Sequence, residues 1–181
     1  ILYSHDSYHA LNFMPYTYKE NYPIDRVYKA LYMQNIETDI VPCDKWIDFS
    51  QYTMLVIPPL YVATDELLSG IDKFVKEGGH VVMLHKSGYC NEHSAVRATL
   101  APGLLRKACG FYYQEYSTID AMPLRDNPYN IEDSHQISDW YEFLQLETAK
   151  PLAYANHPFF GKWPVITENS YGKGKLTYIG T

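Results

Sequence analysis

The sequence lacks the marks of several large classes of protein. No run of Lys and Arg exceeds two residues and the net charge is −6, so we expect no nucleic-acid partner. No stretch of about 18 apolar residues occurs, so we expect no membrane-spanning segment. The three cysteines, Cys43, Cys90 and Cys109, are odd in number and lack CxxC spacing, which argues against a disulfide framework or a zinc site. Reduced thiols favour a cytoplasmic location.

Tyrosine is what the sequence has in excess, with 18 Tyr beside 7 Phe and 3 Trp in 181 residues. The tyrosine side chain joins a large apolar body to a polar tip, so it suits protein interfaces and sugar-facing surfaces alike. This excess predicts a surface that binds something. The segment from His5 to Tyr22, which we predict to be a loop, supplies our candidate interface residues: Tyr8, Phe13, Tyr16 and Tyr18.

The first 90 residues alternate between strand and helix patterns. Apolar runs predict strands over 1–4, 38–42, 52–59 and 80–85. Amphipathic spacing after Pro23 predicts a helix over 24–32. A second helix follows the N-cap signature at Thr64 and ends at Gly78. This order predicts a three-layer α/β fold with a doubly wound, mostly parallel sheet, as a single domain over 1–181.

The second half of the chain is less regular. It predicts a short helix over 103–109, an extended segment over 111–116 and a polar surface excursion over 117–138. The stretch 137–148 is ambiguous between helix and strand. Strands are predicted over 152–155, 165–168 and 175–180, the last after a tight turn at 172–174. The turn precedes a strand and not a helix, which favours a hairpin over a phosphate-binding loop. Both ends of the chain lie in strand-like runs, so we expect a piece of a longer polypeptide.

Ligands of such sheets bind at the carboxyl ends of the strands. These ends carry Ser4-His5-Asp6, the stretch 58–61 and Lys86-Ser87-Gly88, which makes Tyr61 and Lys86 candidates for the rim of a pocket.

Glycoside hydrolysis needs two carboxylates that flank the scissile bond. The Asp and Glu residues fall on predicted helix surfaces and in the irregular half, so we find no such pair at two strand ends.

Histidine residues form the other cluster with chemical potential. His5 and His9 are four residues apart, a spacing that can bind zinc on one helical face, and Asp6 adjoins them. We predict a loop here, and His85 and His93 are distant in sequence. The expectation is therefore of hydrogen-bonded histidines at strand ends, with no metal and no cofactor.

Class I glutamine amidotransferases place a nucleophilic cysteine in a sharp turn between strand and helix. In the matching stretch, 81–88, Lys86 occupies that position and Cys90 comes four residues later. Ser87 lacks the glycines of a GxSxG elbow, and Ser-Gly after a strand is typical of a turn. No His–Glu pair has the position needed to activate a thiol. We therefore predict no catalytic residue in this chain.

Several stretches together resemble the middle domain of family 42 β-galactosidases, and the resemblance covers nearly the whole chain. They are Asp6 with 10–12, 52–61, 78–83 with Ser87-Gly88, Asn91-Glu92, 102–106 with Gly110, 164–167, 171–175 and 178–181. The loop Cys90-Asn91-Glu92-His93 departs from the family pattern, and segment 117–138 shows the least similarity.

The resemblance implies a flavodoxin-like, amidotransferase-like domain without a catalytic cysteine. Such a domain holds its parent enzyme as a homotrimer and helps to enclose the active site of a neighbouring (β/α)8 barrel that hydrolyses terminal β-D-galactosides. The alternatives are a free-standing amidotransferase-like or peptidase-like hydrolase that would use Cys90 or Ser87, and a sugar-binding module on the same fold.

Overall fold

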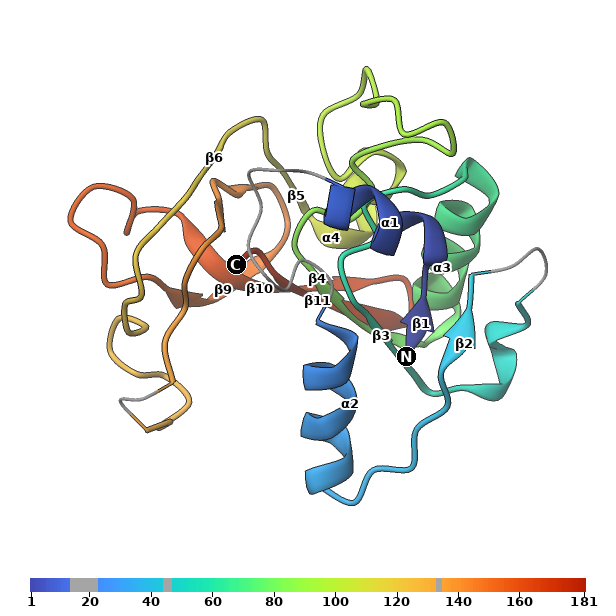
Figure 1. The fold of residues 1–181 in the computed structure, drawn as a ribbon, viewed down its shortest axis with the longest axis horizontal. Coiled ribbons are helices and arrows are strands. Elements are labelled where there is room, and N and C mark those ends of the chain that lie inside the picture. The colour runs from blue at the N-terminus through green and yellow to red at the C-terminus, as the bar shows by residue number, and fades with distance from the viewer. Residues whose placement is uncertain (14–22, 44–46, 133–134) are drawn as a thin grey trace.

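The structure is a computed structural model that describes residues 1–13, 23–43, 47–132 and 135–181. Figure 1 shows a central sheet with helices packed around it and a loop-rich region formed by the second half of the chain. None of the helices within these ranges is long and apolar enough to cross a bilayer.

Five strands form the main sheet, in the order β3-β4-β11-β10-β9. Their bounds are β3 Met54–Ile57, β4 His80–Leu84, β11 Gly174–Ile179, β10 Pro164–Tyr171 and β9 Lys150–Tyr154. Strands β3, β4 and β11 pair in parallel, whereas β10 pairs antiparallel with both of its neighbours. Since β9 and β11 are both antiparallel to β10, four of the five strands run in one direction. The mostly parallel sheet is confirmed, and a hairpin joins β10 to β11 as predicted.

A second, two-stranded parallel sheet lies beside β3 and consists of β1 Leu2–Tyr3 and β2 Val41–Pro42. The strand predicted over 38–42 is therefore shorter than expected. The Thr38 hydroxyl donates to the Ile36 carbonyl at 3.0 Å, a local bond that competes with a strand ladder. Helix α2, Ile24–Met33, precedes this segment close to its predicted bounds.

Helix α3, Asp65–Glu77, covers one face of the sheet and contacts β4 and β11. The N-cap and the C-cap that the sequence predicted are both present. The Thr64 hydroxyl accepts a hydrogen bond from the Leu67 amide at 3.1 Å, and Gly78 ends the helix with a φ of +125°. The helix buries Leu68, Ile71, Phe74 and Val75 against the apolar side chains of the strands. The principal core of the domain therefore lies between α3 and the sheet.

A smaller core lies in the second half of the chain. The 3₁₀ turn Gly103–Leu105 and helix α4, Arg106–Cys109, lead into two short antiparallel pairs. They are β5 Phe111–Tyr112 with β8 Gln145–Leu146, and β6 Tyr116–Ser117 with β7 Tyr141–Glu142. The ambiguous stretch 137–148 thus forms strands. Segment 117–138, predicted as a surface excursion, also buries Ile119 and Leu124 in this core, so that prediction was incomplete.

The loop predicted from His5 to Tyr22 is wrong over its first part, because His5–Phe13 forms helix α1. Ser4 supplies the start of the helix: its hydroxyl accepts from the Ser7 amide at 3.1 Å, and its carbonyl accepts from the Tyr8 amide. Leu11 is fully buried and holds the helix against the domain. Residues 14–22, which include the candidates Tyr16 and Tyr18, lie outside the described residues.

Candidate functional site at the carboxyl end of strand β4

The chain turns sharply just after β4, and the residue at the turn is Lys86. Its backbone has a φ of +60°, in the left-handed region that residues other than glycine seldom adopt. Ser87 and Gly88 follow, and Gly88 is also left-handed, with a φ of +71°. A nucleophile elbow has this kind of backbone, and Lys86 lies at a strained turn directly after the strand.

The side chain of Lys86 is 4% exposed, which is unusual for a lysine. Its Nζ lies 4.2 Å from the centre of the Trp140 ring, a cation–π contact. Tyr116 stacks on the same indole, with ring centres 4.1 Å apart. Burial lowers the pKa of the Lys86 amine to about 8, while the carboxylates of Glu142 and Asp139 act in the opposite direction. The amine is therefore poised to change its charge not far above neutral pH.

Glu142 lies beneath the turn and is completely buried. Its Oε1 accepts from the Lys86 backbone amide at 2.7 Å and from Trp140 Nε1 at 3.1 Å. Its Oε2 accepts from the Tyr178 hydroxyl at 2.8 Å. Burial raises the pKa of the Glu142 carboxyl, and these donors partly offset that rise. Glu142 thus ties the elbow to β7 and β11.

A cavity of about 230 Å³ opens beside this turn. Its wall includes Lys86, Asp139 and Trp140, together with Arg26 at the start of α2 and Gln136. Two cations, a carboxylate, an amide and an indole are groups that can bind a polar ligand. Lys86 therefore lines this cavity, and its role as a binding residue stays a prediction.

The other candidates near this edge have different surroundings. Tyr61 stacks on Tyr89 with ring centres 5.6 Å apart, and it lies outside the wall of the cavity beside Lys86. The Ser87 hydroxyl donates to the Leu84 carbonyl at 2.7 Å and accepts from the Leu60 amide at 3.0 Å. Cys90 is buried, and burial raises the pKa of its thiol. The three cysteines are all free thiols, as predicted.

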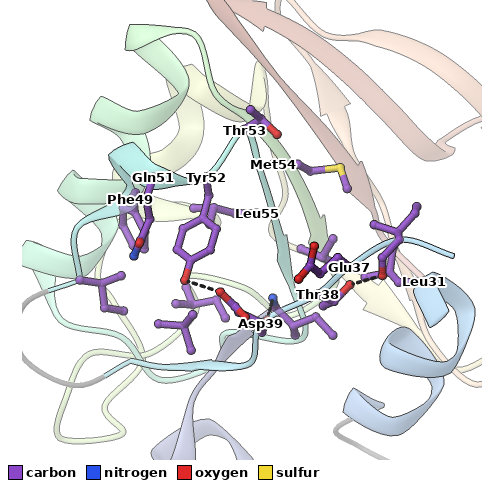
Figure 2. Close-up of a pocket in the computed structure, with 16 residues that line it drawn as sticks. Leu31, Glu37, Thr38, Asp39, Phe49, Gln51, Tyr52, Thr53, Met54 and Leu55 are labelled. Carbon is purple, nitrogen blue, oxygen red and sulfur yellow. Dashed lines mark hydrogen bonds between the residues drawn. The ribbon is translucent and has the colours of Figure 1, made fainter.

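A larger cavity, of about 330 Å³, lies between α2, β2 and β3 (Figure 2). Across it the Tyr52 hydroxyl donates to Asp39 Oδ2 at 3.1 Å. Thr53 and Met54 line it where β3 begins, which is the end of the strand opposite to the one where ligands of such sheets bind. The position of this cavity therefore favours the turn at Lys86 as the candidate site.

The aromatic candidates on α1 lie at the surface. Phe13 is 89% exposed and Tyr8 is 39% exposed, so both are accessible to a partner. His5 and His9 are exposed on the same helix. No group of three His, Cys, Asp or Glu residues that could hold a metal occurs within the part of the chain that the structure describes.

These features define an α/β domain whose strained elbow carries a buried lysine under an indole ring. A sequence model described as the β-galactosidase trimerisation domain matches residues 1–181. The chain belongs to the family of β-galactosidase trimerisation domains, which confirms the resemblance seen in the sequence.

Known relatives agree with this family. The chain is 32% identical to the β-galactosidase LacA of Lactobacillus acidophilus over 154 residues, which are 85% of this chain and 23% of LacA. It is 29% identical to BgaB of Geobacillus sp. (strain Y412MC61) over 159 residues, 87% of this chain and 23% of BgaB. The chain thus spans about a quarter of the length of the curated relatives that it matches.

Solved structures show the same relation. The fold is similar to part of Gan42B, a GH42 β-galactosidase from G. stearothermophilus, with a TM-score of 0.85 and 26% identity. The match covers 99% of this chain and 26% of Gan42B. A β-galactosidase from Bacillus circulans sp. alkalophilus matches with a TM-score of 0.76 and 27% identity, over 87% of this chain and 24% of that one.

Proposed function

We propose that this chain is the assembly domain of a longer β-galactosidase, which it holds as a homotrimer without performing catalysis itself. The match of the trimerisation-domain family over the whole chain carries this proposal. The relatives are about four times longer than the matched region. Hydrolysis of terminal β-D-galactosides would then belong to a (β/α)8 barrel elsewhere in the parent enzyme, and this domain would partner that barrel.

The exposed faces of α1 and α2 are the surface that we propose for self-association. Helix α2 has the apolar spacing of an amphipathic helix, yet none of its residues is buried within the chain. Tyr32 is 66% exposed at its end, and its ring stacks on Tyr28. Amphipathic helices gain most of their stability by packing their apolar face, so a face that its own chain covers only in part favours contact with another copy. Phe13 of α1 is a further exposed aromatic side chain that we assign to the proposed contact.

We propose that the domain also helps to enclose the active site of a neighbouring barrel, with Lys86 and Tyr61 near the contact. The carboxyl edge of the sheet supports this role, because it holds the cavity beside Lys86. We further propose a flavodoxin-like, amidotransferase-like layering. Helix α3 packs on one face of the sheet, and Leu31 of α2 lines the same cavity as Met54 of β3.

The contacts of Cys90 and Ser87 favour assembly over the alternative of a free-standing hydrolase. A reactive cysteine has a lowered pKa, whereas burial raises that of Cys90. A nucleophilic serine gives its proton to a base, whereas the Ser87 hydroxyl donates to a backbone carbonyl. A sugar-binding module would use the cavity beside Lys86, and a titration with galactose would detect it.

Light scattering over a concentration series tests the assembly surface, on this chain and on its parent enzyme. We expect the chain to approach three times 21.0 kDa. Phe13→Ala and Tyr32→Ala should each weaken association by roughly tenfold or more, because large aromatic side chains dominate interface energies. Phe159→Ala is the matched control, since Phe159 is also highly exposed but lies between β9 and β10. If the parent enzyme is a trimer and neither substitution lowers its mass in solution, this surface is not the interface.

A further inference from the structure

Helix α1 carries two histidines, His5 and His9, in a segment that the sequence had predicted to be a loop. His5 and His9 are four residues apart, so they lie on one face of the helix. Their Nε2 atoms are 3.0 Å from each other, and their ring planes meet at 81°. In this contact the Nε2–H of one neutral imidazole donates to the Nε2 lone pair of the other.

The helix that carries the pair is held firmly on the domain. The Ser7 hydroxyl donates to the Val62 carbonyl and accepts from the Val62 amide, both at 3.0 Å. Leu11 is buried one turn further along. The inner face of α1 is therefore fixed, while both imidazoles lie on the exposed face. A site whose ligands stand on an anchored helix is largely preformed.

Tyr3 adjoins the first ring, and its hydroxyl lies 3.4 Å from His5 Nδ1. When Nδ1–H donates to that oxygen, the lone pair of the ring is on Nε2, on the side of His9. An outer hydrogen bond of this kind orients histidine ligands in metal sites. The contact is thus compatible with the tautomer that a metal ion needs.

We propose that His5 and His9 form a two-histidine chelate for one divalent transition-metal ion of the nickel, copper and zinc group. Imidazole nitrogen suits these ions and not Mg²⁺ or Ca²⁺. At metal–nitrogen distances near 2.0 Å, cis ligands of a square-planar ion are roughly 2.8 Å apart and those of a tetrahedral ion roughly 3.3 Å. The observed 3.0 Å lies between these values, so small rotations of the two rings accommodate either geometry.

Two protein ligands leave the remaining coordination positions to solvent. The described residues contain no group of three ligands, so this site differs from a closed structural zinc centre. The bound ion would exchange readily and would link one turn of α1 to the next. It would also lie on the face of the helix that holds Phe13, four residues beyond His9.

Isothermal titration with NiCl₂, and with MgCl₂ as the unsuitable ion, tests the chelate in the full protein. We expect one Ni²⁺ per chain, bound roughly tenfold or more tightly than by either His5→Gln or His9→Gln, because each variant loses one of two ligands. His93→Gln is the matched control, since its imidazole is exposed without a second histidine in contact. The electron paramagnetic resonance spectrum of bound Cu²⁺ should show two equatorial imidazole nitrogens in the wild type and one in His9→Gln.

Equal Ni²⁺ affinities of the wild type and His9→Gln would overturn the proposal. So would a loss of binding in His93→Gln, or a copper spectrum that His9→Gln leaves unchanged. Both substituted side chains are exposed, so an unaltered circular dichroism spectrum verifies that the fold is intact. The mass of the protein is a separate readout, so failure of the chelate leaves the proposed assembly function untouched.

Discussion

Glu142 illustrates how one buried side chain can fix a turn that is unfavourable by itself. The left-handed backbone at Lys86 costs free energy, and the Lys86 amide is one of three donors that converge on this carboxyl group. A buried donor without an acceptor costs about 1–3 kcal/mol. The turn after β4 is thus held by a residue 56 positions away in sequence.

Glu142→Ala should lower the free energy of unfolding by about 3 kcal/mol or more, because it leaves the amide, the indole and the Tyr178 hydroxyl unpaired. Glu142→Gln should cost much less. Its carbonyl oxygen still accepts two hydrogen bonds, and its amide can donate to the Tyr178 hydroxyl. Urea denaturation of both variants measures this difference, and equal losses would show that the hydrogen bonds do not hold the turn.

His85 makes the stability of the domain sensitive to acid. Its imidazole is half-buried beside Lys86, with Nδ1 2.8 Å from the Thr181 carbonyl oxygen. Burial, and then the nearby Lys86 ammonium, lower the pKa of His85 to about 3 from the usual 6.5. Between these two pH values the unfolded chain binds a proton that the folded domain does not. The contribution of His85 to the free energy of unfolding is therefore fully present above pH 6.5 and is lost progressively as the pH falls toward 3.

From pH 7 to pH 5 this linkage should remove about 2 kcal/mol of unfolding free energy. The His85→Gln variant should show a shallower decline, because glutamine does not titrate in this range. His80, whose pKa is also lowered by burial, is present in both proteins and cancels in the comparison. Urea denaturation at several pH values provides the two slopes, and parallel slopes would rule out His85 as their cause.

Helix α3 and helix α1 differ in how clearly their sequences predict them. Thr64 and Gly78 bracket a long amphipathic pattern, so both ends of α3 could be predicted. Helix α1 has only nine residues, and its richness in His and Tyr suggested a loop. The signal that could have identified it is Ser4, followed by Asp6 in the first turn, which is a typical helix start.

The candidate site was predictable only in part, for a physical reason. Lys86 could be placed at the elbow because the pattern of β4 ends just before it. Glu142 and Trp140 could not be assigned to it, since contacts between distant segments leave no local periodicity. Strands β5 to β8 have two residues each, too few for alternation to be seen, so the partners of Lys86 emerge only from the folded chain.

The cap of α3 offers a direct test of the local signal. Thr64→Ala removes the acceptor of the Leu67 amide and should lower the free energy of unfolding by about 1 kcal/mol. Thr64→Ser keeps a hydroxyl in the same place and should be close to neutral. The urea concentrations at the unfolding midpoints of the two variants measure this difference. An Ala variant as stable as the Ser variant would mean that tertiary packing alone fixes the start of the helix.

The distribution of buried side chains predicts that the domain is unevenly stable. The principal core joins α3 to the sheet, and Val81 and Leu176 at its centre are completely buried. Among the described residues, the smaller core of the second half contains seven buried ones, Tyr141 and Phe143 included. Helix α2 contributes no buried residue to either core. Local opening costs least where few apolar contacts hold an element.

Hydrogen exchange should therefore find α2 as an early-opening element in the unassociated chain, while the amides of β4 and β11 exchange only on global unfolding. Association should then slow exchange in α2 specifically, because the neighbouring copy would cover its apolar face. Mass spectrometry of exchange at low and high protein concentration measures both effects, and Tyr32→Ala should remove the dependence on concentration. Slow exchange of α2 in a proven monomer would mean that the helix is already held by its own chain. The self-association surface would then have to lie elsewhere on the domain.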